Sequence, residues 1–208
     1  MSVSPRILIT GFEPFGGIEL NPSGEIARTL DSAAIAGREV VGRVLPVEFG
    51  EAGRQLKSMI RELQPGLVLC LGVAASRQVI SLERVAVNLD DARIPDNAGQ
   101  QPIDQPVVPG APTAYRTTLP VKAMLGGMEA AGIASKLSSS AGHYVCNHLF
   151  YTLMHELEGR EGVRGGFIHV PFAAPSGALE KLIAGIELGA KIALETDVDV
   201  ATPGGRID

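Results

Sequence analysis

The sequence has no tryptophan and only two cysteines among its 208 residues. Two cysteines are too few for the disulfide framework of a small secreted domain, and this usage favours a reducing compartment. The first residues lack the organisation of a secretory signal. No apolar run approaches the ~18 residues that a membrane-spanning helix needs. We therefore expect a cytoplasmic protein that does not bind membranes.

Basic residues are also scarce. Eighteen Lys and Arg against 23 Asp and Glu give a formal net charge of −5, and the basic residues form no cluster. Nucleic acid is therefore not an expected partner. The metal-site patterns CxxC, HxxxH and HExxH are missing, as are the GxSxG of serine hydrolases and a complete phosphate-binding motif. We therefore expect neither a metal nor an organic cofactor.

The apolar pattern predicts one α/β domain covering residues 1–208. Strands and helices alternate, which favours a twisted, largely parallel but mixed sheet with helices on both faces. Functional sites in such sheets gather at the carboxyl ends of the strands. The predicted strands are 6–10, 39–47, 67–73, 78–89, 133–138 and 166–172, and the predicted helices are 22–31, 49–63, 121–131, 145–157 and 176–195.

Cys146 lies where a loop of small residues becomes a helix, because apolar residues recur at helical spacing from Val145 onward. The unpaired N–H groups and the dipole of a helix start favour negative charge. We therefore expect the pKa of this thiol to be lowered, which would make it a nucleophile. A cysteine that only packs is the competing interpretation. Cys70 lies in an apolar strand and is expected to be structural.

Two remote residues are candidate partners for Cys146. His169 lies within an apolar strand, whereas His148 projects to a different side of the Cys146 helix and is expected to be a surface or packing residue. Glu83 lies on a mostly apolar strand face, where a carboxylate needs a partner. The adjacent Arg84 points the other way, which leaves a histidine or an arginine elsewhere. A thiol, a histidine and a carboxylate are the parts of a nucleophilic site.

Two loops add further candidates. The glycine-rich loop 11–17 carries Phe12 and Phe15, which either cap the core or wall an apolar pocket. The irregular stretch 90–112 is long enough to be functional or mobile. Its only cation is Arg93, which either pairs with a nearby aspartate or points at negative charge that develops in a site.

Five long segments carry a family resemblance: ILITGFEPFGGIELNPS, LERVAVNLDDARIPDN, AYRTTLPVKAM, SSAGHYVCNHLFY and GFIHVPF. These segments stand in the order that the family has, and they span nearly all of the chain from Ile7 to Phe172. Through them the sequence resembles the pyroglutamyl peptidase I (pyrrolidone-carboxylate peptidase) family of cysteine peptidases. The resemblance implies an α/β/α sandwich, a cytosolic homotetramer and no cofactor. It also implies an omega exopeptidase that hydrolyses the amide bond after an N-terminal pyroglutamyl residue of peptides through a thioester.

The family resemblance assigns a role to each candidate. Cys146 would be the nucleophile, His169 its base and Glu83 the residue that orients the histidine. These are the three residues that the strand and helix patterns also select.

The resemblance also predicts the substrate pocket. Phe12 and Phe15 would sandwich the lactam ring, Tyr144 would line the same pocket, and Arg93 would lie near the oxyanion.

The sequence departs from the family pattern at two positions that are expected to lie near the site. Val73 stands where many relatives have glutamine, and Arg116 stands where an aromatic residue is frequent. Two alternatives therefore stay open: a related thiol amidohydrolase that acts on another cyclic amide, and a non-catalytic protein that binds small molecules, nucleosides included, on the same scaffold.

Overall fold

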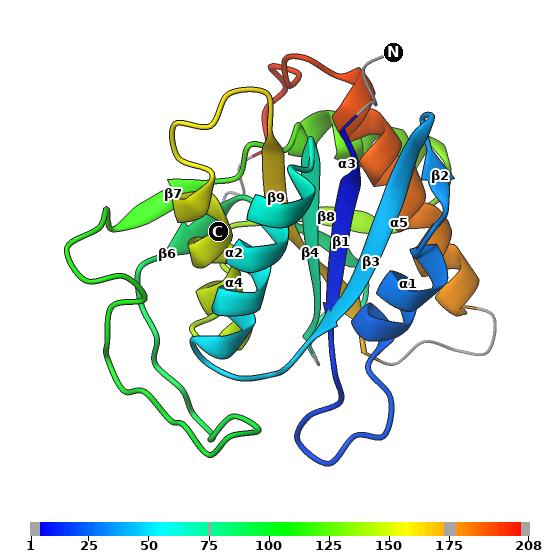
Figure 1. Ribbon diagram of the computed structural model, residues 1–208. Helices are drawn as coiled ribbons and strands as arrows, with labels where there is room; N and C mark the ends of the chain where they lie inside the picture. The colour runs from blue at the N-terminus through cyan, green and yellow to red at the C-terminus, as the bar shows by residue number, and fades with distance from the viewer. Residues whose placement is uncertain (1–4, 75, 173–177, 205–208) are drawn as a thin grey trace.

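The computed structural model describes residues 5–74, 76–172 and 178–204. Its centre is a seven-stranded mixed sheet, which confirms the predicted fold class (Figure 1). The β2–β3 and β5–β9 pairs are antiparallel and the other pairs are parallel. In spatial order the strands are β2 (Ala34–Ile35), β3 (Arg38–Leu45), β1 (Ile7–Phe12), β4 (Leu67–Ala74), β9 (Arg164–Pro171), β5 (Ile80–Glu83) and β8 (Ser135–Ser138).

Helices cover both faces of this sheet, which gives the α/β/α sandwich (Figure 1). One core cluster joins the sheet to α1 (Pro22–Leu30), α3 (Val121–Ala130) and α5 (Ala178–Glu195). The other joins it to α2 (Glu51–Leu63) and α4 (Val145–Glu156). The predicted start of the last helix, at residue 176, lies outside the described residues.

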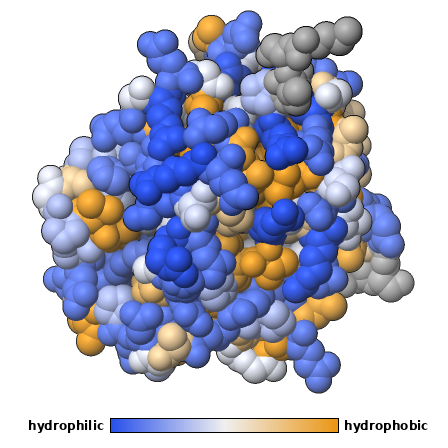
Figure 2. Space-filling view, viewed as in Figure 1, coloured by the Kyte–Doolittle hydropathy of each residue, from blue (hydrophilic) through white to orange (hydrophobic). Residues whose placement is uncertain are grey.

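The central strands β1 and β4 are apolar along nearly their whole length because both of their faces are buried. Successive side chains of a strand point to opposite faces. In β4, Leu69 and Leu71 therefore join the core under α1, α3 and α5, whereas Val68 and Cys70 join the core under α2 and α4. On the face that Figure 2 shows, polar side chains predominate, and apolar ones gather between α2 and β3.

The predicted strand 78–89 is wrong as one element. The chain breaks at Arg84 into β5 and β6 (Val85–Val87), and β6 pairs with β7 (Ala114–Arg116) in a separate two-stranded sheet. Arg84 donates its N–H to the Ser138 carbonyl (2.8 Å) and accepts at its own carbonyl from Thr117 (3.0 Å). The backbone thus changes partners at Arg84, and no change in the apolar pattern accompanies the switch.

The stretch between β6 and β7 contains no helix or strand of this structure, as predicted for the long loop. An isolated bridge between Asp90 and Gln105 closes it on itself. No helix in the part of the chain that the structure describes is long and apolar enough to span a bilayer.

Candidate active site

The thiol of Cys146 lies against the middle of the sheet. Cys146 is the second residue of α4, as the sequence predicts. A Cβ atom added to Gly72 of β4 would lie 2.9 Å from its Sγ atom, so the thiol reaches the strand only because residue 72 has no side chain. Gly72 is paired in register with His169 of β9. Residues paired in this way project to the same face, so His169 and the thiol share one side of the sheet.

His169 and Glu83 form a buried pair, as the sequence predicts. The Nδ1 atom of His169 lies 2.8 Å from Oε1 of Glu83, and the two residues are 2% and 0% exposed. The strands β9 and β5 are antiparallel neighbours, which brings together two residues that are 86 positions apart. If Nδ1 carries the proton, Nε2 keeps a lone pair on the far edge of the ring, where it can serve as a base.

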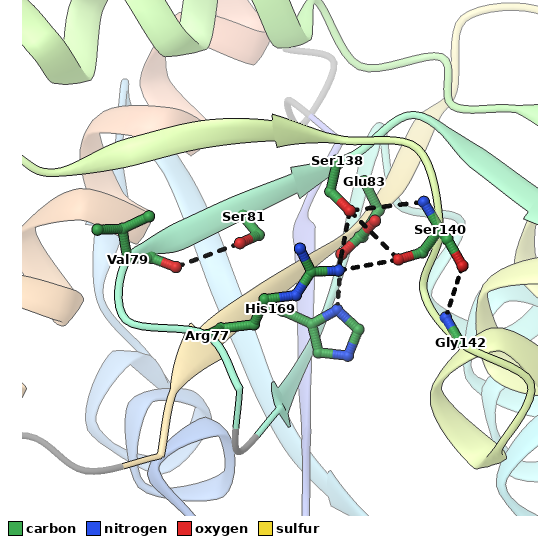
Figure 3. Close-up of polar contacts among 8 residues, drawn as sticks. All are labelled: Arg77, Val79, Ser81, Glu83, Ser138, Ser140, Gly142 and His169. Carbon is green, nitrogen blue, oxygen red and sulfur yellow. Dashed lines mark hydrogen bonds and ion pairs between the residues drawn. The ribbon is translucent and has the colours of Figure 1, made fainter. Parts of the chain in front are cut away.

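An arginine that the sequence analysis did not select also contacts Glu83. Arg77, in the loop that follows β4, lies 3.3 Å from Oε1 of Glu83 (Figure 3). Both predicted kinds of partner, a histidine and an arginine from elsewhere, are therefore present. Arg84 makes no ion pair with Glu83 among the residues that the structure describes.

An apolar pocket opens beside the thiol. The rings of Phe15 and Tyr144 lie 6.4 Å apart across it, centroid to centroid. Among its described lining residues Asn21 carries a side-chain amide, which accepts from Ser23 as the N-cap of α1 and donates to the carbonyl of Glu13. The pocket is lined by Phe12, Phe15, Asn21, Val47, Val73, Tyr144, Val145 and Cys146. The predicted aromatic residues and the thiol therefore share one cavity.

The predicted lowering of the thiol pKa is wrong for this structure. Burial raises the pKa of Cys146 to about 12, with smaller contributions in the same direction from the negative charge of Glu83 and from Cys70. The loss of hydration outweighs the favourable field of the helix start. At neutral pH the thiol is therefore protonated, and a base must remove its proton before or during an attack.

Comparisons with known proteins agree along nearly the whole chain. The family model described as pyroglutamyl peptidase matches residues 5–202. The pyrrolidone-carboxylate peptidases of Yersinia pestis and Yersinia pseudotuberculosis are each 46% identical to the chain, over 97% of its length and 99% of theirs. The chain belongs to the pyroglutamyl peptidase family.

Solved structures of the pyroglutamyl peptidase family have the same fold. The pyroglutamyl peptidase I from Bacillus amyloliquefaciens superposes with a TM-score of 0.92 at 37% identity, over 96% of this chain and 100% of that one. The pyrrolidone carboxyl peptidase from Thermococcus litoralis gives a TM-score of 0.91 at 41% identity, over 96% and 99% of the two chains.

His148 is buried in this pyroglutamyl peptidase family member, so the predicted surface position is wrong and the packing role is right. Its Nδ1 atom lies 2.7 Å from Oδ2 of Asp90, and its Nε2 atom accepts the N–H of Gly50 (3.1 Å). Phe49 packs edge-on against both His148 and Tyr144. The histidine thus joins α4 to the loop before α2 and to the long loop 90–112.

Arg93 and Arg116 are not among the described residues that line the pocket beside the thiol, whereas Val73 is one of them. The side chain of Arg93 is exposed and has neither a hydrogen bond nor an ion pair with the described residues, so the predicted alternative of pairing with a nearby aspartate is not seen. Val73 lines the pocket beside the thiol, which agrees with its predicted position near the site. Arg116 instead lies on β7 and lines a different cavity together with Arg84 and Arg164.

Within the described parts of the chain, no group of three His, Cys, Asp or Glu residues could hold a metal ion. The site therefore offers a thiol, an imidazole and a carboxylate as its reactive groups, beside an apolar cavity.

Proposed function

We propose that the protein is a cysteine exopeptidase that releases an N-terminal pyroglutamyl residue from peptides. The observation that carries this proposal is the buried His169–Glu83 pair on the same side of the sheet as the Cys146 thiol. The apolar cavity beside the thiol suits a pyroglutamyl ring, which has no charge because its amine is closed into a lactam.

The reaction begins at the thiol of Cys146. His169 takes the thiol proton at Nε2 while Sγ attacks the carbonyl carbon of the pyroglutamyl residue. Glu83 accepts the Nδ1–H bond and stabilises the imidazolium. The C–N bond then breaks, His169 gives its proton to the departing amine, and a thioester remains. Water, deprotonated by His169, hydrolyses the thioester and restores the thiol.

The tetrahedral oxyanion needs donors. The N–H of Cys146, in the first turn of α4, is the first donor that we propose for it, and Arg93 is the second. One donor of this kind contributes about 3–4 kcal/mol to lowering the barrier. Phe12 and Phe15 would enclose the ring together with Tyr144.

Hydrolysis of a fluorogenic pyroglutamyl amide tests the function. The wild type should release the fluorophore and Cys146→Ser should not, whereas Cys70→Ser, at a buried cysteine outside the pocket, should retain activity. Equal rates for wild type and Cys146→Ser would refute the nucleophile. Full-length similarity to pyroglutamyl peptidases does not favour the alternatives of another cyclic amide or a non-catalytic binding protein.

We also propose that the protein acts in the cytoplasm as a homotetramer, as its family resemblance implies. Both cysteines are free, and a reducing compartment would keep the Cys146 thiol available. Light scattering on the purified protein should give four times the 21.8 kDa mass of the chain.

A further inference from the structure

Glu83 is a carboxylate without access to water. It is 0% exposed, its Oε1 atom is shared by His169 and Arg77, and its Oε2 atom has no hydrogen-bond partner among the described residues. A buried charge must be paired, and a neutral imidazole supplies a hydrogen bond but no opposite charge. Arg77 is the cation in contact with it. The charge of Glu83 is therefore balanced by Arg77 rather than by His169.

Arg77 also holds the segment that leads to the nucleophile. The same guanidinium nitrogen that contacts Glu83 donates to Oγ of Ser138 (2.9 Å) and to the carbonyl of Ser140 (2.9 Å), as Figure 3 shows. Ser138 ends β8, and Ser140 lies in the loop between β8 and α4, the helix that carries Cys146. One side chain thus joins the loop after β4, the end of β5 and the approach to α4.

We propose that Arg77 is a positioning residue for the reaction, acting through Glu83 and through the loop that carries Cys146. It balances the carboxylate so that Oε1 is held toward Nδ1 of His169, and that bond fixes the orientation of the ring and leaves Nε2 as its free nitrogen. Arg77 is not among the described residues that line the pocket beside the thiol, so we expect its effect to fall on the chemical step rather than on binding. This inference rests on the proposed peptidase function only for its kinetic readout.

The neighbour Arg84 provides a matched control. It follows Glu83 directly in the chain, yet it makes no ion pair with that carboxylate in the described residues and its side chain lines a separate cavity. Both positions carry an arginine close to Glu83 in the sequence, but only Arg77 contacts the carboxylate. Comparing the two variants therefore separates the effect of losing a nearby arginine from the effect of losing the ion pair.

The kinetic test compares Arg77→Met, Arg77→Lys and Arg84→Met on a fluorogenic pyroglutamyl amide. Arg77→Met should lower kcat by about 10- to 100-fold, a usual size for losing a residue that orients a reactive group, with KM changed less than about twofold. Arg77→Lys should recover part of the loss because an ammonium still balances the carboxylate. Arg84→Met should match the wild type. If Arg77→Lys lowers kcat as much as Arg77→Met does, the positive charge at residue 77 does not act by balancing Glu83.

A double variant covers the case in which Arg77→Met fails to fold because Glu83 is left unpaired. In the background of Glu83→Gln there is no charge to balance and only the contacts of Arg77 with Ser138 and Ser140 remain, so adding Arg77→Met should lower kcat by a clearly smaller factor than it does in the wild type. An equal factor in the two backgrounds would show that Arg77 does not act through Glu83.

A spectroscopic readout separates this inference from the proposed function. The Nδ1 proton of His169, assigned by its loss in His169→Asn, should give a downfield proton resonance that Arg77→Met weakens or shifts and Arg77→Lys keeps. An unchanged resonance together with an unchanged kcat in Arg77→Met would overturn the inference. A wild type that hydrolyses no pyroglutamyl amide would refute the function, while the resonance would still test Arg77.

Discussion

Gly72 and Cys146 occupy complementary space. An added Cβ at residue 72 would lie 2.9 Å from Sγ of Cys146 and 2.7 Å from Cζ of Phe167. β4 is hydrogen-bonded to β1 on one side and to β9 on the other, so its backbone cannot easily move away. The position of the nucleophile therefore depends on the absence of a side chain in the neighbouring strand.

Gly72→Ala should impair both stability and catalysis. Forcing one carbon into a packed core costs about 1–3 kcal/mol, and the shift falls on the thiol and on Phe167. We expect a lower urea midpoint and a reduced kcat. Gly126→Ala is the matched control, because nothing lies within 4 Å of its added Cβ and it sits in α3, where alanine is the better helix former. Similar behaviour of the two variants would contradict the tight fit at Gly72.

Glu83→Gln should separate activity from stability. The amide keeps the shape of the side chain but no longer fixes the tautomer of His169, so kcat should fall by about 10²- to 10⁴-fold, the range seen when a triad carboxylate is neutralised. Stability should change much less than activity, because the amide can still hydrogen-bond to His169 and Arg77, and the Arg77 side chain left without its carboxylate is partly exposed to water. Kinetics and urea unfolding on the same samples test this. A parallel loss of stability and activity would indicate that Glu83 is a structural residue.

The sequence predicted the parts of the site that depend on local periodicity. Alternating apolar residues placed Glu83 and His169 on strands, and helical spacing placed Cys146 at a helix start. Each of these patterns is set by which side chains face the core, so it can be read from neighbouring residues.

Features that depend on distant residues could not be predicted in this way. The break at Arg84 follows from hydrogen bonds to Ser138 and Thr117, which no local pattern records. The contacts of Arg77 and the burial of His148 likewise depend on how separate loops meet. The thiol pKa was predicted in the wrong direction because a helix start is visible in the sequence, whereas the depth of burial is not.

The rate at which Cys146 is alkylated should rise with pH through the alkaline range, because the pKa of its thiol is raised. In a Cys70→Ser background, the rate with iodoacetamide should be low at neutral pH and rise by about tenfold per pH unit through the alkaline range, because the reactive thiolate forms only near the pKa of about 12. Mass spectrometry of the labelled peptide gives the rate at each pH. A plateau near neutral pH would instead support the lowered pKa that the helix start predicts.

Cys70 should make the protein less stable at high pH. Burial raises its pKa from 9.0 to about 12. Because the folded state holds this proton more tightly than the unfolded chain, the contribution to stability is complete below pH 9 and is lost as the pH rises toward 12. Urea unfolding between pH 8 and about 10.5 should show a falling free energy of unfolding, with a shallower slope for Cys70→Ala. If the free energy of unfolding falls equally steeply with pH in the wild type and in Cys70→Ala, Cys70 does not contribute to the loss of stability at high pH.

His148 should matter for stability and for the pocket, although it takes no part in the chemistry. Because Nε2 accepts the N–H of Gly50, Nδ1 must carry the proton that Asp90 accepts. His148→Leu leaves the buried carboxylate of Asp90 without this partner, which costs about 1–3 kcal/mol, and it also removes the acceptor of the Gly50 N–H. It also removes the support of Phe49, which packs on Tyr144 in the pocket wall, so KM should rise as well. The exposed His143 provides the control, since His143→Leu breaks no hydrogen bond of its side chain among the described residues. If both leucine variants unfold at the same urea concentration and bind substrate equally well, the buried His148 contacts do not support the site.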